Sequence, residues 1–197
     1  NLKILKLNNL VLPDLIKIAI IHYQFETIHP FLDGNGRVGR LLITLYLVDK
    51  GILKQPILYL SDFFERNRML YYDNLMRART HNDVNQWLKF FLTGIIEISK
   101  NGVETFNGIM QLQKNLDIKL QTLGIRSIEA QKIIDYLYKN PVIDASKVEK
   151  IINKSKATHY KLIADLERLE ILKEISGAQR NKLYVFKDYL DLFNDKK

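Results

Sequence analysis

The residues best suited to chemistry in this sequence lie close together, between His29 and Arg40. This segment contains a histidine, a carboxylate, an amide, three glycines and two arginines. A histidine side chain, whose ordinary pKa is about 6.5, can take up a proton at neutral pH. A carboxylate can bind a divalent cation, and arginines neutralise phosphate oxygens. The combination is typical of a site that transfers a nucleotide.

The glycines of this segment predict a turn that binds anions. Gly34 and Gly36 can adopt positive φ, so the backbone N–H groups of residues 34–37 can point inward as a nest. The nest leads into the start of a helix, where unpaired N–H groups also favour phosphate. The amide of Asn35 adds a donor for a phosphate oxygen.

Charged side chains flank this turn. Arg37 and Arg40 are three positions apart, so a helix would direct both from one face toward a polyphosphate. Asp33 precedes the nest and is the candidate ligand for Mg²⁺. His29 is the candidate general base. Phe31 is expected in the core, where it would anchor the loop.

Each of these residues also has an ordinary structural explanation. A histidine before proline commonly is solvated or caps a helix, Asp-Gly is a frequent turn, and helical arginines usually form surface ion pairs. The spacing Gly34-x-Gly36-x-x-Gly39 also fits a dinucleotide-binding loop, but a helical pattern precedes it where that loop requires a strand. The coincidence of all these residues at one loop-to-helix junction favours phosphate chemistry.

The composition is that of an ordinary soluble protein. The chain has 197 residues, 47% of them hydrophobic, and a net charge of +8, which suits either nucleic-acid binding or simple solubility. Cysteine is absent, and neither a membrane-spanning run nor a signal peptide is visible, so we expect a cytoplasmic protein without a membrane partner. Because the chain begins with Asn1, we expect it to be part of a longer protein.

Helical periodicity dominates the first part of the chain. Pro13 and Asp14 suit a first helical turn, Pro30 should end that helix and force His29 into an extended conformation, and Gly51 should close the next helix. Ser61 and Asp83 are candidate caps for two further helices. The expected helices cover residues 12–27, 36–50, 61–79, 83–99 and 103–123.

The character of the chain changes near residue 124, where we expect a domain boundary. Three shorter helices are predicted at 127–139, 144–152 and 156–169, followed by strands at 171–175 and 183–186 around a polar turn. Three helices and a hairpin are typical of the winged-helix variant of helix-turn-helix.

DNA is a possible partner of this second domain. Candidate contacts come from the start of the helix 156–169 and from the hairpin turn. They are Lys156, Thr158, His159, Lys161, Arg180 and Lys182. The alternative is a solvated basic face on a module used for protein docking or homodimerisation.

The segment from His29 to Arg40 resembles the signature H-x-F-x-[DE]-G-N-G-R-x-x-R of the Fic (filamentation-induced-by-cAMP) family at every specified position. The similarity continues through residues 22–28 and 60–67. It implies an all-α Fic helical core over residues 1–123, truncated at its N-terminus, followed by a small winged-helix (α+β) domain over residues 124–197, as in many bacterial members.

The resemblance implies a protein adenylyltransferase, which moves AMP from ATP to a Ser, Thr or Tyr hydroxyl of a target protein and releases pyrophosphate. His29 would deprotonate the hydroxyl, Asp33 would hold Mg²⁺, and Arg37 and Arg40 would bind the β- and γ-phosphates. The implied nucleotide-binding residues are Asp33, Gly34, Asn35, Gly36, Arg37, Gly39 and Arg40, with the pair Tyr71 and Tyr72, for which a place in the helix core is the alternative.

Two features of many relatives are missing. The inhibitory motif [ST]-x-x-x-E-[GN] has its nearest approach in Ser61-x-x-x-Glu65, but Arg66 follows. The hairpin, or flap, that docks target peptides in relatives would precede residue 1. Arg40 is therefore expected to be unrestrained. Two other functions remain open: a DNA-binding regulator whose Fic core senses nucleotide, and removal of AMP by the same site.

Overall fold

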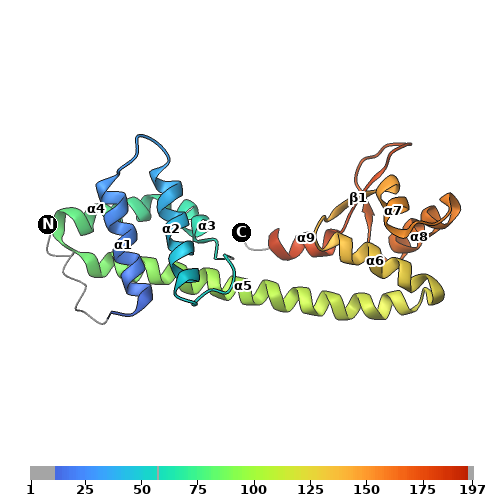
Figure 1. The fold of residues 1–197 in the computed structure, drawn as a ribbon, viewed down its shortest axis with the longest axis horizontal. Helices are drawn as coiled ribbons and strands as arrows, with labels where there is room; N and C mark the ends of the chain where they lie inside the picture. The colour runs from blue at the N-terminus through green and yellow to red at the C-terminus, as the bar shows by residue number, and fades with distance from the viewer. Residues whose placement is uncertain (1–11, 57, 195–197) are drawn as a thin grey trace. The chain divides into compact units, whose positions relative to one another are not determined.

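The computed structural model describes residues 12–56 and 58–194 and is mostly helical, with one small antiparallel sheet (Figure 1). The chain forms two compact units, Asn1–Asn101 and Gly102–Lys197, and the division falls within the long helix α5 (Val84–Gln121). Among the described residues no helix combines the length and apolarity needed to cross a membrane.

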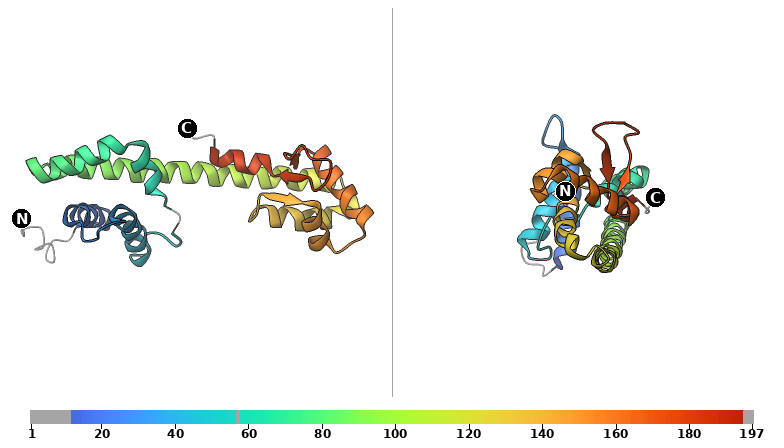
Figure 2. Two further views of the ribbon diagram at one scale, coloured as in Figure 1. Left: turned by 90° about the horizontal axis from the view of Figure 1, so that it is seen from above. Right: turned by 90° about the vertical axis from the view of Figure 1, so that its right-hand side faces the viewer.

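The N-terminal unit is a group of helices around an aromatic core. Its helices are α1 (Asp14–Ile28), α2 (Asn35–Asp49), α3 (Leu60–Arg66), α4 (Arg68–His81) and the first part of α5. Helices α1 and α2 lie side by side, and the loop between them carries the candidate site (Figures 1 and 2). The buried aromatic rings of this core are Tyr23, Phe63, Phe64, Tyr71, Trp87 and Phe91.

Two hydrogen bonds fix the neighbours of α1. The hydroxyl of Tyr46, near the end of α2, donates to the Asp14 carboxylate at the start of α1 over 2.8 Å. The Trp87 indole N–H, from α5, donates to the carbonyl of Ala19 over 2.9 Å inside the core. Directional bonds thus accompany apolar packing on both sides of α1.

The single helix predicted over residues 61–79 is two helices in the structure. The break is at Asn67, whose side-chain amide donates to the Phe63 carbonyl over 2.9 Å and so competes with the helical backbone. Ser61 does not cap α3, which already begins at Leu60. Asp83, by contrast, accepts from the Gln86 N–H at the start of α5, as predicted.

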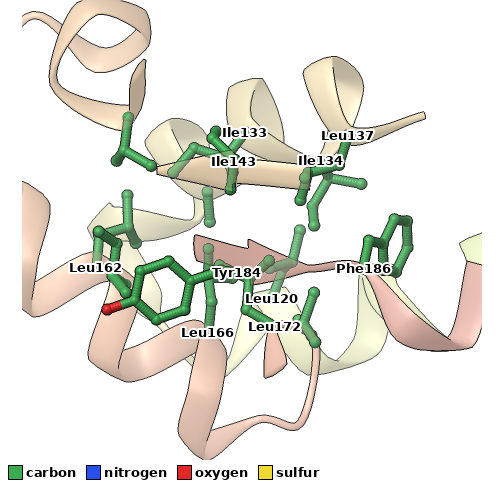
Figure 3. Packing of buried hydrophobic residues seen from close by; sticks show 14 of the residues in the cluster. Leu120, Ile133, Ile134, Leu137, Ile143, Leu162, Leu166, Leu172, Tyr184 and Phe186 are labelled. Atoms are coloured by element: carbon green, nitrogen blue, oxygen red, sulfur yellow. The ribbon is translucent and has the colours of Figure 1, made fainter. Parts of the chain in front are cut away.

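The C-terminal unit combines helices with a three-stranded sheet. Its elements are α6 (Ser127–Leu137), β1 (Val142–Asp144), α7 (Ala145–Ile152), α8 (Lys156–Arg168), β2 (Lys173–Glu174), β3 (Leu183–Val185) and α9 (Lys187–Asn194), after a short 3₁₀ turn at Gly124–Arg126. The strand order is β1-β3-β2, and both pairs are antiparallel. Figure 3 shows the aliphatic side chains of α6 and α8 converging on Tyr184 and Phe186.

Several elements of this unit were not expected. Strand β1 pairs with β3 through Ile143 and Tyr184, and α9 runs beside α5, where Leu192 packs close to Gly108 (Figure 2). Helix α5 is continuous through Gly102, although two helices were predicted. Leu116 and Leu120 of α5 belong to the C-terminal core, so this unit includes residues on the N-terminal side of the boundary expected near residue 124.

Candidate functional site

His29 ends α1 in a left-handed conformation. Its φ and ψ are 50° and 59°, and its N–H donates to the Phe25 carbonyl over 3.0 Å. The expectation of an extended backbone before Pro30 is therefore wrong, because closing the helix end required a left-handed residue, a conformation in which histidine is enriched. The residue is exposed, so its imidazole is accessible to a substrate.

Asn35 closes the loop that follows. Its side-chain amide donates to the Phe31 carbonyl over 2.6 Å, and its carbonyl oxygen accepts from the Phe31 N–H over 2.9 Å. Asn35 is 2% exposed. Both polar ends of the Asn35 side chain therefore hold the loop. The side-chain N–H₂ group, which was expected to donate to a phosphate, donates to the Phe31 carbonyl instead. Phe31 itself is half exposed, and its backbone rather than a buried ring anchors the loop.

The start of α2 has the properties of an anion-binding nest. Gly34 is the N-cap with φ of 82°, and no side chain caps this end of the helix. The first backbone N–H groups of α2 therefore have no partner within the helix and remain available to an anion. Gly36 is helical, contrary to the expectation of positive φ, and an added Cβ there would lie 3.1 Å from a guanidinium nitrogen of Arg40.

The two arginines border the same cavity. A hollow of about 300 Å³ is lined by Arg37 and Arg40 of α2, together with Leu41, Thr44, Pro56, Leu58, Tyr59 and Ser61. Arg37 also contacts Asp33 over 3.2 Å, in an ion pair whose side chains are 76% and 93% exposed. Within residues 12–56 and 58–194, Arg40 makes no ion pair. The expectation of two guanidiniums on one helix face agrees with this arrangement.

Gly39 is required by the packing of α1 on α2. A Cβ at this position would lie 2.4 Å from a carboxylate oxygen of Glu26 and 3.1 Å from ring atoms of His22 and Phe25. Gly39 is buried beneath the nest, so it allows the two helices to approach and does not face a nucleotide. Its assignment as a nucleotide contact is corrected accordingly.

Beneath the nest, His22 joins three helices. It is fully buried, its Nδ1 lies 3.0 Å from the Gly39 carbonyl oxygen, and its Nε2 lies 3.0 Å from the Tyr71 hydroxyl of α4. Since a carbonyl can only accept, Nδ1 carries the hydrogen, and Nε2 accepts from the Tyr71 hydroxyl. We call this set, His22, Gly39 and Tyr71, the buried clamp.

Burial keeps His22 neutral. The pKa of His22 is lowered from 6.5 to about 4, and burial is the largest cause. The charge of Arg40 also lowers this pKa, while the bond to Gly39 raises it. The ring stacks on Phe64 and Trp87, with centroids 5.7 and 5.9 Å away. Sequence reasoning gave His22 no role of its own, because only the positions of Gly39 and Tyr71 reveal it.

The tyrosine pair is divided between the interior and the surface. Tyr71 is 4% exposed and belongs to the buried clamp, so the core alternative describes it. Tyr72 is 54% exposed and packs edge-on against Tyr71, with the Arg68 guanidinium over its ring. Of the two, only Tyr72 is accessible to a ligand.

Glu26 is a second residue that sequence reasoning missed. One oxygen of its carboxylate is buried without a hydrogen-bond partner among the described residues. Burial raises the pKa of Glu26, while the nearby charges of His29 and Arg40 oppose this rise. A carboxylate therefore lies close enough to both the candidate base and the second arginine to feel their charges.

The metal site expected at Asp33 rests on one carboxylate. No cluster of three or more His, Cys, Asp or Glu side chains able to hold a metal ion occurs in the described part of the chain. Mg²⁺ bound with a nucleotide commonly uses one or two protein carboxylates, phosphate oxygens and water. The single exposed carboxylate of Asp33, beside the nest, fits that donor set.

The residues predicted to contact DNA have different environments. Lys156, Lys161, Arg180 and Lys182 are exposed. Thr158 is half-buried, and its hydroxyl lies 2.9 Å from that of Ser155. His159 is 2% exposed and stacks beside Tyr160, so it points into the unit and its assignment as a DNA contact is wrong.

Known proteins resemble the N-terminal part of the chain. Residues 4–47 match the model of the Fic/DOC family. The chain is 46% identical over 66 residues to a probable protein adenylyltransferase of Aquifex aeolicus, a match covering 33% of this chain and 18% of that protein. It is 36% identical over 72 residues to the protein adenylyltransferase Fic of Nematostella vectensis, which covers 36% and 15%.

A solved structure is similar over more of the chain. A Fic family protein from Desulfovibrio desulfuricans G20 is 22% identical, with a TM-score of 0.48, over 91% of this chain and 51% of that one. The family match includes the whole segment from His29 to Arg40. Residues 4–47 therefore match the Fic/DOC family, which confirms the resemblance found in the signature. It spans less than a fifth of the two curated relatives it matches.

Proposed function

We propose that this chain transfers AMP from ATP to a hydroxyl of a protein. The observation that carries the proposal is the junction of α1 and α2, where an exposed histidine, an uncapped helix start and two arginines occur together. Two relatives of this chain are named protein adenylyltransferases or probable ones. The arginines can neutralise the negative charge of a triphosphate, and the histidine can remove the proton of an acceptor hydroxyl.

The chemistry follows from positions at this junction. The imidazole of His29 takes the proton of the acceptor Ser, Thr or Tyr as its oxygen attacks the α-phosphorus, and pyrophosphate leaves. The N–H groups at the start of α2 stabilise the charge that develops on the phosphate oxygens. Arg37 and Arg40 hold the β- and γ-phosphates, so the leaving group is oriented away from the acceptor.

Asp33 and Arg37 exchange partners when the nucleotide binds. In their present ion pair both side chains are largely exposed, so water screens the attraction and the pair is easily separated. The β-phosphate then takes Arg37, and the freed carboxylate of Asp33 is available to Mg²⁺. When bound, Mg²⁺ supplies positive charge that neutralises the phosphates. The pair keeps both groups near the nest before ATP arrives.

Replacing the base tests the proposal directly. We expect His29→Ala to lower AMP transfer by about 10²–10⁴-fold, the usual contribution of a general base, while ATP affinity stays within about twofold. Transfer is followed with ATP labelled on the α-phosphate, and affinity by calorimetry. His81→Ala, at an exposed histidine of α4, is the matched control and should retain full activity. Undiminished transfer in His29→Ala would refute the role of this residue.

Replacing the second arginine tests the position of the nucleotide. We expect Arg40→Ala to weaken ATP binding by about tenfold or more but to change AMP affinity little, because only ATP has a γ-phosphate to lose. The two affinities are measured by calorimetry on the same samples. Equal losses for ATP and AMP would exclude a γ-phosphate contact.

We also propose that the C-terminal unit is a winged-helix module. The helices α6, α7 and α8 and the β2–β3 hairpin have the chain order of that fold, and β1 adds its third strand. The turn Asn153-Lys154-Ser155 between α7 and α8 contains Asn153 with φ of 49°, which allows a tight reversal. This assignment covers the region predicted from residue 124 onward.

A further inference from the structure

We propose that the C-terminal unit binds double-stranded DNA through the exposed face of α8 and the turn between β2 and β3. This inference rests on the winged-helix assignment and is independent of adenylyl transfer. We call the residues involved the basic face: Lys156, Tyr160, Lys161, Arg180 and Lys182. All five are exposed.

The position of α8 is fixed by its inner side. Leu162 and Leu166 are 1% and 0% exposed and point toward Tyr184 of β3 (Figure 3). Lys119 of α5 donates to the Leu169 carbonyl, just after α8, over 2.8 Å. The inner side of α8 is therefore held rigidly, and its opposite side is presented to solvent in one orientation.

The exposed side of α8 has the composition of a helix that enters a groove. It presents Lys156, Ala157, Tyr160, Lys161 and Ala164. The two alanines let the helix backbone approach closely, the lysines can reach phosphates, and the tyrosine hydroxyl can donate to a phosphate or a base edge. A helix about 10–12 Å wide matches the major groove, which is about 12 Å wide.

Of the two carboxylates of α8, Asp165 and the half-buried Glu167, the first does not offset these cations. Asp165 is 9% exposed on the inner side, where it pairs with Arg126 over 2.9 Å and with Arg168 over 3.2 Å. Neither Lys156 nor Lys161 forms an ion pair within residues 12–56 and 58–194. Their charges are therefore directed outward, toward a polyanion.

The hairpin turn is rigid and basic as well. The Glu174 carboxylate accepts from the N–H groups of Ser176 and Gly177 and from the Ser176 hydroxyl, and these bonds lower the pKa of Glu174. One carboxylate oxygen, Oε1, thus accepts all three bonds and braces the turn, and Lys182 is near enough to feel the charge of Glu174. Beyond this brace the turn projects from the sheet and carries Arg180 (Figure 1).

The same surface fits a protein partner poorly. The centre of a protein–protein interface is rich in large apolar side chains and poor in lysine. The exposed side of α8 instead combines lysines and alanines with a single large ring, that of Tyr160. Duplex RNA is disfavoured too, because its deep and narrow major groove does not admit a helix.

Anisotropy of a fluorescent DNA duplex of about 30 base pairs, titrated with the whole chain at several salt concentrations, tests this inference. We expect log affinity to fall linearly with log salt, since binding releases counterions. In Lys156→Ala/Lys161→Ala the slope should become shallower by about 2, and affinity at about 0.1 M salt should fall about ten- to a hundredfold. Arg180→Ala/Lys182→Ala should behave in the same way.

The control removes the same charge elsewhere in the unit. Lys132 is exposed on α6 and Lys139 is exposed just after this helix; Lys132 borders a hollow shared with Asp117 and Gln121 of α5. Lys132→Ala/Lys139→Ala should leave both slope and affinity unchanged, and circular dichroism should show the same fold in all variants. No binding at about 50 mM salt would overturn the inference. An equal loss of DNA affinity in the control variant would also overturn it. So would poly-glutamate or duplex RNA that displaces the labelled duplex as well as unlabelled DNA does.

Discussion

The two compact units of this chain differ in what they bury. The N-terminal unit places His22, Asn35 and Asn74 in or beside an aromatic core, and the first two lie directly beneath the candidate site. The core of the C-terminal unit is mostly aliphatic, its buried polar side chains His159 and Asp165 belong to α8, and most of its candidate contacts are on the surface. Directional bonds fix an atom's position more narrowly than apolar packing does. We therefore expect a site that must orient a triphosphate to depend on the bonds of His22 and Asn35, and a surface that binds a regular duplex to depend on its outward-facing side chains.

The largest expected effect concerns the aliphatic core. Leu166→Ala should destabilise the C-terminal unit by about 2–5 kcal/mol, because a fully buried leucine leaves a cavity when truncated. Urea denaturation measures this loss. The exposed Leu45 offers a matched control, for which Leu45→Ala should change stability by less than about 0.5 kcal/mol. Because Leu166 is not part of the N-terminal core, AMP transfer by the folded variant should be unchanged. Slower transfer would contradict the view that the site depends on the N-terminal core alone.

A somewhat smaller effect is expected from acid on the buried clamp. The pKa of His22 is lowered from 6.5 to about 4, so between these pH values the unfolded chain binds a proton that the folded chain excludes. Stability should therefore be complete above about pH 6.5 and should fall by about 3 kcal/mol as the pH decreases to about 4.

Comparison with His22→Gln isolates this contribution. The raised pKa of Glu26 acts in the opposite direction, since the folded chain then holds a proton on this carboxyl more readily. Glu26 is present in both proteins, so the difference between their urea-derived stabilities at pH 7 and pH 4.5 reports His22. Parallel pH dependence in the two proteins would contradict a buried neutral histidine.

The smallest of the three effects is expected at the contact between α1 and α2. Gly39→Ala should cost about 1–3 kcal/mol, because the new Cβ would lie 2.4 Å from the Glu26 carboxylate and the helices must shift. Adding Glu26→Ala should recover part of this loss. Gly102→Ala, in α5 with open space around the new Cβ, should instead stabilise by about 0.5–1 kcal/mol. Thermal unfolding compares the variants, and a harmless Gly39→Ala would remove the packing explanation for this glycine.

Local signals predicted most helices of this chain. Pro13 and Asp14 mark the start of α1, Gly51 follows the end of α2, and Asp83 caps α5, each through an interaction within a few residues. The elements that were missed depend on distant partners. Strand β1 is three residues long and exists because Tyr184 pairs with Ile143, which no periodicity reveals. Two helices were predicted over residues 83–99 and 103–123, yet α5 continues through Gly102 because each half packs in a core of its own.

The candidate site was predictable in its residues but less so in their roles. His29, Gly34, Arg37 and Arg40 are placed at one junction, as their spacing indicated. The identities of neighbouring residues say little about which atoms bond, so the loop closure by Asn35 could be seen only in three dimensions. The buried clamp escaped prediction for the same reason, since its members come from three separate helices.

The most direct test of the central claim compares two labels on the same nucleotide. The chain is incubated with a cell lysate and with ATP labelled on either the α- or the γ-phosphate, and acid-stable label on protein is scored. The account predicts that the α-label appears on protein, with release of pyrophosphate, and that the γ-label does not. Incorporation of the γ-label without the α-label would contradict adenylyl transfer at the junction of α1 and α2.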